Sequence, residues 1–383
     1  MRRLVRGLCL VATVAAFAAT GCGSSSDDNS SSSSGTGSSS AATAKKQGLK
    51  VGFVYVSPIP GSAWSSAWDV TRKDLERKFG AKTTVVQPIP ENPEVVGTFN
   101  DLIRKGNKLI FATAFGYQPF VAQVAKQNPD VDFVVTGPWA QKEDRPANVS
   151  SVYANLWEVR YLTGMIAASM SKKKSLGFVS AFSIPSVVAG INGFEQGVKS
   201  VDPKIKTKVV LTSNWYNPPQ STQAAETLAK SGADVIAKHE DSVGPLLGAK
   251  AAGVWGIGSE ADTSSQTPET YLTGSVYDWS RYAEKKYQEA VDGNFTNEEV
   301  NGDLKSGMVK LGPINAKVPA DVKDKVKKAQ QQIEDGSLVV FKGPIKSNTG
   351  ETKLPAGKEW KSPADVYTNM TFFVDGVQGK IQQ

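Results

Sequence analysis

Short apolar segments alternate with amphipathic segments along residues 49–259. The apolar runs LKVGFVYV, KLIFAT and VDFVVTG are rich in β-branched and aromatic residues, which favours buried strands. The stretches between them place apolar residues at helical spacing. The pattern predicts strands at 49–56, 82–89, 108–113, 131–137, 175–181, 207–213, 233–239 and 253–259. It predicts helices at 64–79, 94–105, 118–126, 158–170, 187–201, 221–230, 243–252 and 279–291.

This alternation predicts an α/β fold of parallel sheets with helices on both faces. The alternating elements form two sets in series, and the roughly 335 residues that carry them are too many for one small core, so we expect two lobes. Open α/β sheets bind ligands at the carboxyl ends of their strands. The glycine string GINGFEQG lies inside a predicted helix, which indicates close helix packing rather than a phosphate-binding loop.

Aromatic and acidic side chains gather in the loops that follow the strands. These loops read SPIPGSAWSSAW, ATAFGYQP, TGPWA, TSNWYNPP, AKHEDS, GIGSEAD and VYDWS. For a single ring, packing in a core or hinge is an equally good interpretation. For the whole set, the mixture favours a pocket for a planar ligand that forms hydrogen bonds. The set comprises Trp64, Trp68, Phe115, Tyr117, Trp139, Trp215, Tyr216 and Trp279, with Asn214, His239, Glu240, Asp241, Glu260 and Asp262.

The first 22 residues have the pattern of a secretory signal. Arg2, Arg3 and Arg6 precede a short apolar run, and small residues lead to Cys22. The apolar run is shorter than the ~20 residues that a spanning helix needs. The segment Ala19-Thr20-Gly21-Cys22 resembles a bacterial lipobox, although that pattern prefers leucine at the position of Ala19. An ordinary cleaved signal is the alternative.

The residues after Cys22 are almost all small and polar, which predicts a flexible tether over 23–47. We therefore predict a signal peptide at 1–22, lipidation of Cys22, and export to the outer face of the bacterial cell membrane. Cys9 would leave with the signal, which excludes disulfides and thiolate zinc sites from the mature chain.

The chain has few of the residues and motifs on which catalytic sites are usually built. His239 is its single histidine, and it contains neither a G-x-S-x-G elbow nor a Walker motif. We predict no enzymatic activity, no metal and no cofactor. The net charge of +7 is spread along the chain, with Lys172 to Lys174 as the longest basic run. Nucleic-acid binding requires a basic stripe with aromatic residues, so a nucleic-acid partner is not predicted.

Several segments resemble the basic membrane protein (BMP) family of ABC-importer substrate-binding lipoproteins. They include VGFVYVSPIPGSAWSSAWDVTRKDLE, ATAFGY, YLTGMIAASMSKKKSLGFVSAFSIPSVVAGINGFEQG, NWYNPPQSTQAAETLAKSGADVIAKHEDS and LKSGMVKLGPI. The resemblance runs from about Leu49 to Lys380. It implies a type I periplasmic-binding-protein fold with three crossovers, a permease and its ATPase as partners, and a purine nucleoside or free purine as ligand.

The resemblance also implies roles for individual residues. Trp64 and Trp215 match the aromatics that cover the two faces of the base. Phe115 and Tyr117 match an F-G-Y turn beside the pocket, and His239, Glu240 and Asp241 fall where relatives read H-T-D. The predicted ligand-binding residues are Trp64, Phe115, Tyr117, Trp215, His239, Asp241 and Asp262.

Two departures from the family pattern leave the ligand open. GSAWSSAW replaces the D-x-S-F-N motif of nucleoside binders, which leaves a free base or another ring as an option. Compared with the branch that reads G-W-T-Y there, Ser66 and Trp68 replace tyrosine and histidine.

We predict a first lobe at 48–154 and 278–297 and a second at 155–277 and 298–383. A ligand sensor without an importer and an exported nucleoside hydrolase remain alternatives.

Overall fold

The computed structural model describes residues 48–139 and 142–382, which contain two separate main sheets. The first lobe is built on a parallel six-stranded sheet in the order β11-β5-β4-β3-β1-β2. Its strands are β1 Lys50–Val54, β2 Lys82–Val86, β3 Leu109–Ala112, β4 Asp132–Thr136, β5 Val149–Ala154 and β11 Glu299–Gly302. Its helices are α1 Ala63–Phe79, α2 Val95–Arg104, α3 Gln118–Gln127 and α8 Ser280–Asp292, with short 3-10 turns at Phe115–Tyr117 and Lys142–Asp144.

The second lobe is built on a seven-stranded sheet in the order β12-β10-β9-β8-β6-β7-β17. Its strands are β6 Ser175–Ser180, β7 Lys206–Leu211, β8 Val235–His239, β9 Trp255–Glu260, β10 Tyr271–Tyr277, β12 Val309–Leu311 and β17 Val377–Gln378. Only the β10–β12 pair in this sheet is antiparallel. Its helices are α4 Leu156–Met170, α5 Pro185–Val201, α6 Pro218–Lys230, α7 Gly244–Ala251, α9 Ala320–Glu334 and α10 Pro363–Asn369, with a 3-10 turn at Ser264–Gln266. Two small antiparallel sheets pair β13 Phe341–Lys342 with β16 Glu359–Trp360, and β14 Ile345–Lys346 with β15 Thr352–Leu354.

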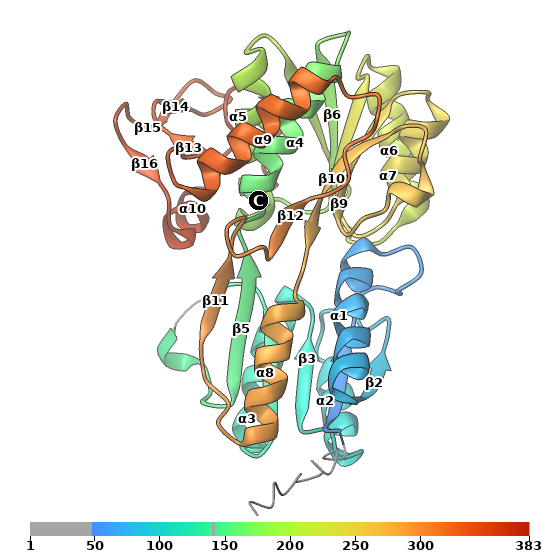
Figure 1. Ribbon diagram of the computed structural model, residues 1–383, viewed down its shortest axis with the longest axis vertical. Helices are drawn as coiled ribbons and strands as arrows, with labels where there is room; N and C mark the ends of the chain where they lie inside the picture. Colours follow the sequence, from blue (N-terminus) through green and yellow to red (C-terminus); the bar gives the residue numbers. More distant parts are fainter. Residues whose placement is uncertain (1–47, 140–141, 383) are drawn as a thin grey trace, which may run out of the picture. The chain divides into compact units, whose positions relative to one another are not determined.

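Helices cover both faces of the second sheet, with α6 and α7 on one side and α4 and α5 on the other (Figure 1). The α4–α5 contact is close because glycines face the neighbouring backbone. A Cβ on Gly164 would lie 2.1 Å from the carbonyl oxygen of Phe194, and one on Gly197 would lie 1.9 Å from that of Tyr161. The prediction that GINGFEQG serves helix packing is therefore confirmed. The predicted α/β fold class, with parallel sheets flanked by helices, is confirmed as well.

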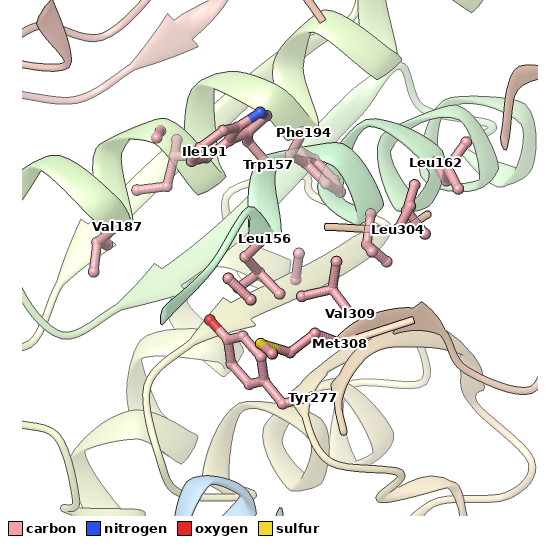
Figure 2. Packing of buried hydrophobic residues seen from close by; sticks show 14 of the residues in the cluster. Leu156, Trp157, Leu162, Val187, Ile191, Phe194, Tyr277, Leu304, Met308 and Val309 are labelled. Atoms are coloured by element: carbon pink, nitrogen blue, oxygen red, sulfur yellow. The ribbon is translucent and has the colours of Figure 1, made fainter. Parts of the chain in front are cut away.

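A buried cluster lies where the chain passes between the lobes. Figure 2 shows Leu156 and Trp157 at the start of α4 near Ile191 of α5, with Tyr277 and Met308 from the two later connections close by. All five side chains are buried. Because these connections share one core, the strand ends of the two sheets are held beside each other at this point.

The chain passes between the two sheets three times. The first passage follows β5, the second follows β10, and the third lies between β11 and β12. The prediction from the sequence places residues 298–302 in the second lobe. In the structure, however, β11 pairs in parallel with β5 of the first sheet. We therefore propose that the third passage falls after Gly302, and the division into lobes otherwise stays as predicted. No helix within 48–139 or 142–382 is long and apolar enough to cross a membrane.

Candidate functional site

A cavity lies between the strand-end loops of the two sheets. Both lobes contribute to its wall, and the lining combines aromatic rings with three carboxylates. The lining residues are Val56, Trp64, Glu91, Ala114, Phe115, Thr136, Tyr153, Ile184, Ser186, Trp215, His239, Asp241 and Glu260.

Trp64 is held rigidly at the start of α1. Its Nε1–H donates to the carbonyl oxygen of Thr113 at 2.6 Å. Its ring meets Tyr277 edge-on at 5.4 Å and 90°, and it meets Trp279 at 5.8 Å and 73°. Trp279 in turn stacks on Trp68 at 4.9 Å, and both of these rings are fully buried. Core packing is therefore the correct interpretation for Trp68 and Trp279, and their packing fixes the orientation of Trp64.

Trp215 lines the cavity from the second lobe. Its ring meets Phe182 edge-on at 5.2 Å and 63°, and its carbonyl oxygen accepts a hydrogen bond from Asp241 N–H at 2.8 Å. The residue is half-buried, which leaves part of the indole free to contact a ligand. The cavity thus has one tryptophan from each lobe.

Asp241 connects the loops of the two lobes. The Oγ of Ser57, after β1, donates to its Oδ2 at 2.5 Å, and the N–H of Ala63 donates to its carbonyl oxygen at 2.8 Å. Burial, followed by the nearby charge of Glu260, raises the pKa of Asp241 well above its usual value. Since one carboxylate oxygen is taken by Ser57, the other is the one available to a ligand.

Glu260 ends β9 in an unusual conformation. Its φ is +76°, a left-handed value that is costly for a residue with a side chain and that concentrates at functional sites. The carboxylate is buried, and among the described contacts its Oε2 has no hydrogen bond, with the ammonium of Lys238 3.7 Å away. Burial raises the pKa of Glu260, whereas the positive charges of Lys238 and Arg160 lower it.

A buried cationic layer supports this end of the cavity. Arg160 of α4 donates through Nη2 to the carbonyl oxygen of Lys238 at 2.7 Å and to Ser259 Oγ at 2.6 Å. Lys238 Nζ donates to the carbonyl oxygen of Glu240 at 2.5 Å. Both cations are fully buried, so they partly balance the acidic wall from behind without lining the cavity.

His239 is neutral in this setting. Burial first, and then the charges of Arg160 and Lys238, lower the pKa of its imidazole well below the usual value. A neutral imidazole has one nitrogen that donates and one that accepts. Its Nδ1 lacks a hydrogen-bond partner among the described residues. Whether His239 offers a ligand a donor or an acceptor then depends on which ring nitrogen carries the proton.

Glu91 completes the acidic wall from the loop after β2. Its Oε1 accepts from the N–H of Gly116 at 2.7 Å, which fixes the turn that carries Phe115. Burial raises the pKa of Glu91, and contacts with Gly116 and the indole of Trp215 oppose that shift. Phe115 lines the cavity and is 48% exposed overall, so its ring has surface left for a ligand to cover.

The structure brings five of the seven predicted binding residues together, namely Trp64, Phe115, Trp215, His239 and Asp241. Tyr117 and Asp262 do not line the cavity. Tyr117 is fully buried, donates its hydroxyl to the carbonyl oxygen of Ile89 and meets the Phe99 ring at 6.0 Å. Asp262 is exposed, and its Oδ1 accepts from Ser264 N–H at 2.9 Å.

Several lining residues were not predicted. Glu260 belonged to the wider set of strand-end side chains but not to the predicted binding residues. Tyr153 is the next-to-last residue of β5, a strand whose two serines interrupt its apolar pattern. Glu91 lies in a loop with no recognisable motif around it. The positive φ of Glu260 cannot be predicted from the sequence. Its position at the end of a predicted strand, however, could have identified it as a binding residue.

The sequence profile of a family described as "ABC transporter substrate-binding protein PnrA-like" (Bmp) matches residues 49–340. The chain is 34% identical to a purine-binding protein of Brucella abortus over 340 residues, which cover 88% of this chain and 95% of the relative. It is 29% identical to a putative ABC transporter glucose-binding protein of Haloferax volcanii over 335 residues, 87% of this chain and 81% of the relative. A solute-binding protein of an ABC transporter system from Aeropyrum pernix superposes with a TM-score of 0.68 at 16% identity, over 85% of this chain and all of that one.

Proposed function

Because this chain belongs to the Bmp family of PnrA-like ABC transporter substrate-binding proteins, we propose that its cavity binds a purine base or a purine nucleoside. The observation that carries the proposal is the pair Trp64 and Trp215, which come from different lobes and line one cavity together with three carboxylates. The similarity to the purine-binding protein of Brucella abortus supports the same ligand class.

The chemistry of the wall fits an unphosphorylated ring with several N–H donors. An aromatic stack contributes about 1–3 kcal/mol per base, and two such rings are available. Asp241 and Glu260 can accept from ring or exocyclic N–H groups, while neutral His239 can pair with a ring nitrogen. Neither lysine nor arginine is among the lining residues, so a phosphate group would meet carboxylates without a cation beside it.

Capture follows from contacts that exist only when the lobes are close. Ser57 and Ala63 of the first lobe bond to Asp241 of the second, and Tyr216 donates to the carbonyl oxygen of Pro60 at 3.2 Å. A ligand that touches both walls adds further contacts to this closed arrangement and therefore favours it. The closed form is the one that we propose a permease and its ATPase recognise.

Purine binding is expected to appear directly in calorimetry. The mature chain, titrated with adenine, guanine, hypoxanthine, adenosine and inosine, should release heat with at least one of them, and the same ligand should quench tryptophan fluorescence because Trp64 and Trp215 lie at the site. Glucose and an amino acid serve as controls. Heat with glucose and none with any purine would contradict the ligand class. Free base released from inosine would instead indicate a hydrolase.

We further propose that the protein is exported and attached to the outer face of the membrane through lipid on Cys22, which lies outside the described residues. The support is the lipobox-like sequence before Cys22 and the polar stretch after it. A ligand sensor without an importer would share the same binding site. Genes for a permease and an ATPase next to this one would favour import.

Replacing Cys22 by serine should move the protein from the membrane fraction to the soluble or secreted fraction. The thiol is the acceptor of the lipid, and a hydroxyl at this position does not receive it. Fractionation of host cells followed by immunoblotting measures the shift, with Cys9→Ser as the matched control because Cys9 lies within the signal. Equal membrane association of the parent and the Cys22→Ser variant would exclude the anchor.

A further inference from the structure

The C-terminal segment, residues 341–382, lies beyond the part of the chain that the family profile matches. It contains β13 to β16, α10 and β17, and it packs beside α5 (Figure 1, red). Its last strand, β17, pairs in parallel with β7 at the edge of the second sheet. The segment is therefore part of the second lobe rather than a separate unit.

A buried asparagine fixes this segment to α5. Asn192 is fully buried, its Nδ2 donates to the carbonyl oxygen of Phe372 at 2.8 Å, and its Oδ1 accepts from Val374 N–H at 3.0 Å. Two hydrogen bonds from one buried side chain hold the backbone of the segment in register. Movements of the segment are thus linked to the body of the second lobe.

One part of the segment reaches the cavity wall through Tyr367 of α10. Its ring meets Tyr153 at 5.9 Å and 67°, and Trp157 at 5.4 Å and 80°. Tyr153 lines the cavity, and its ring centroid lies 6.4 Å from that of Tyr277. The hydroxyl of Tyr367 is buried without a hydrogen-bond partner among the described residues, so the ring and not the hydroxyl supports Tyr153.

The other end of the segment ties together two loops that carry cavity residues. Gln382 N–H donates to Ser183 Oγ at 2.9 Å, and Gln382 Nε2 donates to Ser213 Oγ at 3.2 Å. Ser183 precedes the lining residues Ile184 and Ser186, whereas Ser213 lies two residues before Trp215. Ser213 has a φ of +56°, so its loop is held in a conformation that is uncommon for serine.

We infer that residues 341–382 position the cavity wall on both lobes, with Tyr367 acting on Tyr153 of the first lobe and Gln382 acting on two loops of the second lobe. Tyr367 supports Tyr153 from behind, and Gln382 fixes the spacing between the loop of Ile184 and the loop of Trp215. Neither residue lines the cavity, so both act through others. The inference rests on the proposed function only for the choice of purine as the probe.

Loss of this support should weaken binding without abolishing the fold. If the wall adopts its binding arrangement about one tenth of the time in Tyr367→Ala, the apparent Kd of the purine rises about tenfold. Tyr367→Phe should bind like the parent because the ring is kept. Deletion of residues 382–383 should give a smaller loss, of about threefold, since Gln382 is exposed and its hydrogen bonds are weaker.

Calorimetry on the mature chain and hydrogen exchange of residues 182–186 and 213–217 test the inference together. Trp360→Ala is the matched control, since this ring lies in the same segment but pairs with Phe372 at 6.3 Å, away from the cavity. The expected result is weaker binding by Tyr367→Ala and faster exchange of both loops in the deletion variant, with Trp360→Ala unchanged in both.

Two results would overturn the inference. The first is parent-like binding and exchange in both Tyr367→Ala and the deletion variant. The second is an equal loss in Trp360→Ala, which would show a general effect on folding. If Tyr367→Ala fails to fold, the deletion variant decides, because the contacts of Gln382 that it removes are exposed. If the parent binds no purine, the proposed ligand is wrong, and loop exchange alone then decides whether the segment positions the wall.

Discussion

Trp215→Ala should weaken purine binding by at least about tenfold, the size expected for the loss of one aromatic stack. The half-buried indole lines the cavity and is held edge-on by Phe182, so its orientation is set before a ligand arrives. A rigid ring loses little entropy when a base stacks on it, and its removal therefore costs most of the stacking energy. Calorimetry with the purine that binds the parent most tightly gives the change in Kd.

The controls separate stacking from general damage. Trp215→Phe should recover much of the affinity, since it keeps a flat ring. Trp255 is another half-buried tryptophan of the second lobe, but it lies beneath Lys317 and does not line the cavity. Trp255→Ala should therefore bind like the parent. Trp64→Ala should also weaken binding, with some loss of stability because Trp64 packs on Tyr277 and Trp279. Parent-like binding by both Trp64→Ala and Trp215→Ala would show that these rings only pack.

The strand-end rule explains why much of the site was predictable. Parallel strands bring their carboxyl ends to one edge of a sheet. His239 ends β8, and the segments that follow β1, β3 and β7 supply Trp64, Phe115 and Trp215. Two lobes followed from the same alternation of elements. The prediction fails where local backbone geometry decides, since the sequence does not show which way a loop turns.

Three residues illustrate that limit. Tyr117 follows Phe115 by two positions, but the 3-10 turn directs it into the core of the first lobe. Asp262 follows Glu260 by two positions, but it is exposed, and the chain between them passes through the left-handed φ of Glu260. Glu91 reaches the cavity through a contact with Gly116 that is 25 residues away in the chain, which no local pattern reveals.

The passages between lobes were harder to place for a different reason. The strand β11, EVNG, is short and polar, and only its pairing with β5 assigns it to the first sheet. Likewise β5 contains Ser150 and Ser151, both buried, which break the apolar run expected of a central strand. Polar residues in buried strands are tolerated where their hydrogen bonds are satisfied, as for Ser150 with the hydroxyl of Tyr282 at 2.7 Å.

Purine affinity should fall as the pH is lowered from about 8 to about 5.5, and this dependence should be smaller in Asp241→Asn. Burial raises the pKa of Asp241, and the charges of Glu260 and Glu240 raise it further, while Lys238 and the Ser57 hydroxyl lower it. A ligand N–H prefers the ionised carboxylate, so binding below the pKa of the free protein releases a proton. Affinity is then full above that pKa and drops by up to about tenfold per pH unit below it.

The same substitution should weaken binding at about pH 8, because it removes a charge-assisted acceptor that is worth roughly 1.5–3 kcal/mol, or about ten- to a hundredfold in Kd. The asparagine keeps the shape of the side chain and can still accept from Ser57 Oγ, so the contact between the lobes is preserved. Calorimetry in two buffers with different heats of ionisation counts the protons released, and this count should be lower in the variant.

Glu195→Gln is the matched control for the pH experiment. This carboxyl is also buried, burial raises its pKa to about 7, and it accepts from Thr207 Oγ1 at 2.6 Å, but it does not line the cavity. Its replacement should change how stability depends on pH while leaving the pH dependence of purine binding as in the parent.

If the affinity of the parent protein rises toward low pH, a protonated Asp241 or Glu260 donates to the ligand. The acidic wall would then recognise ring acceptors rather than N–H donors, because the two carboxyls share their charge and cannot both be ionised without cost.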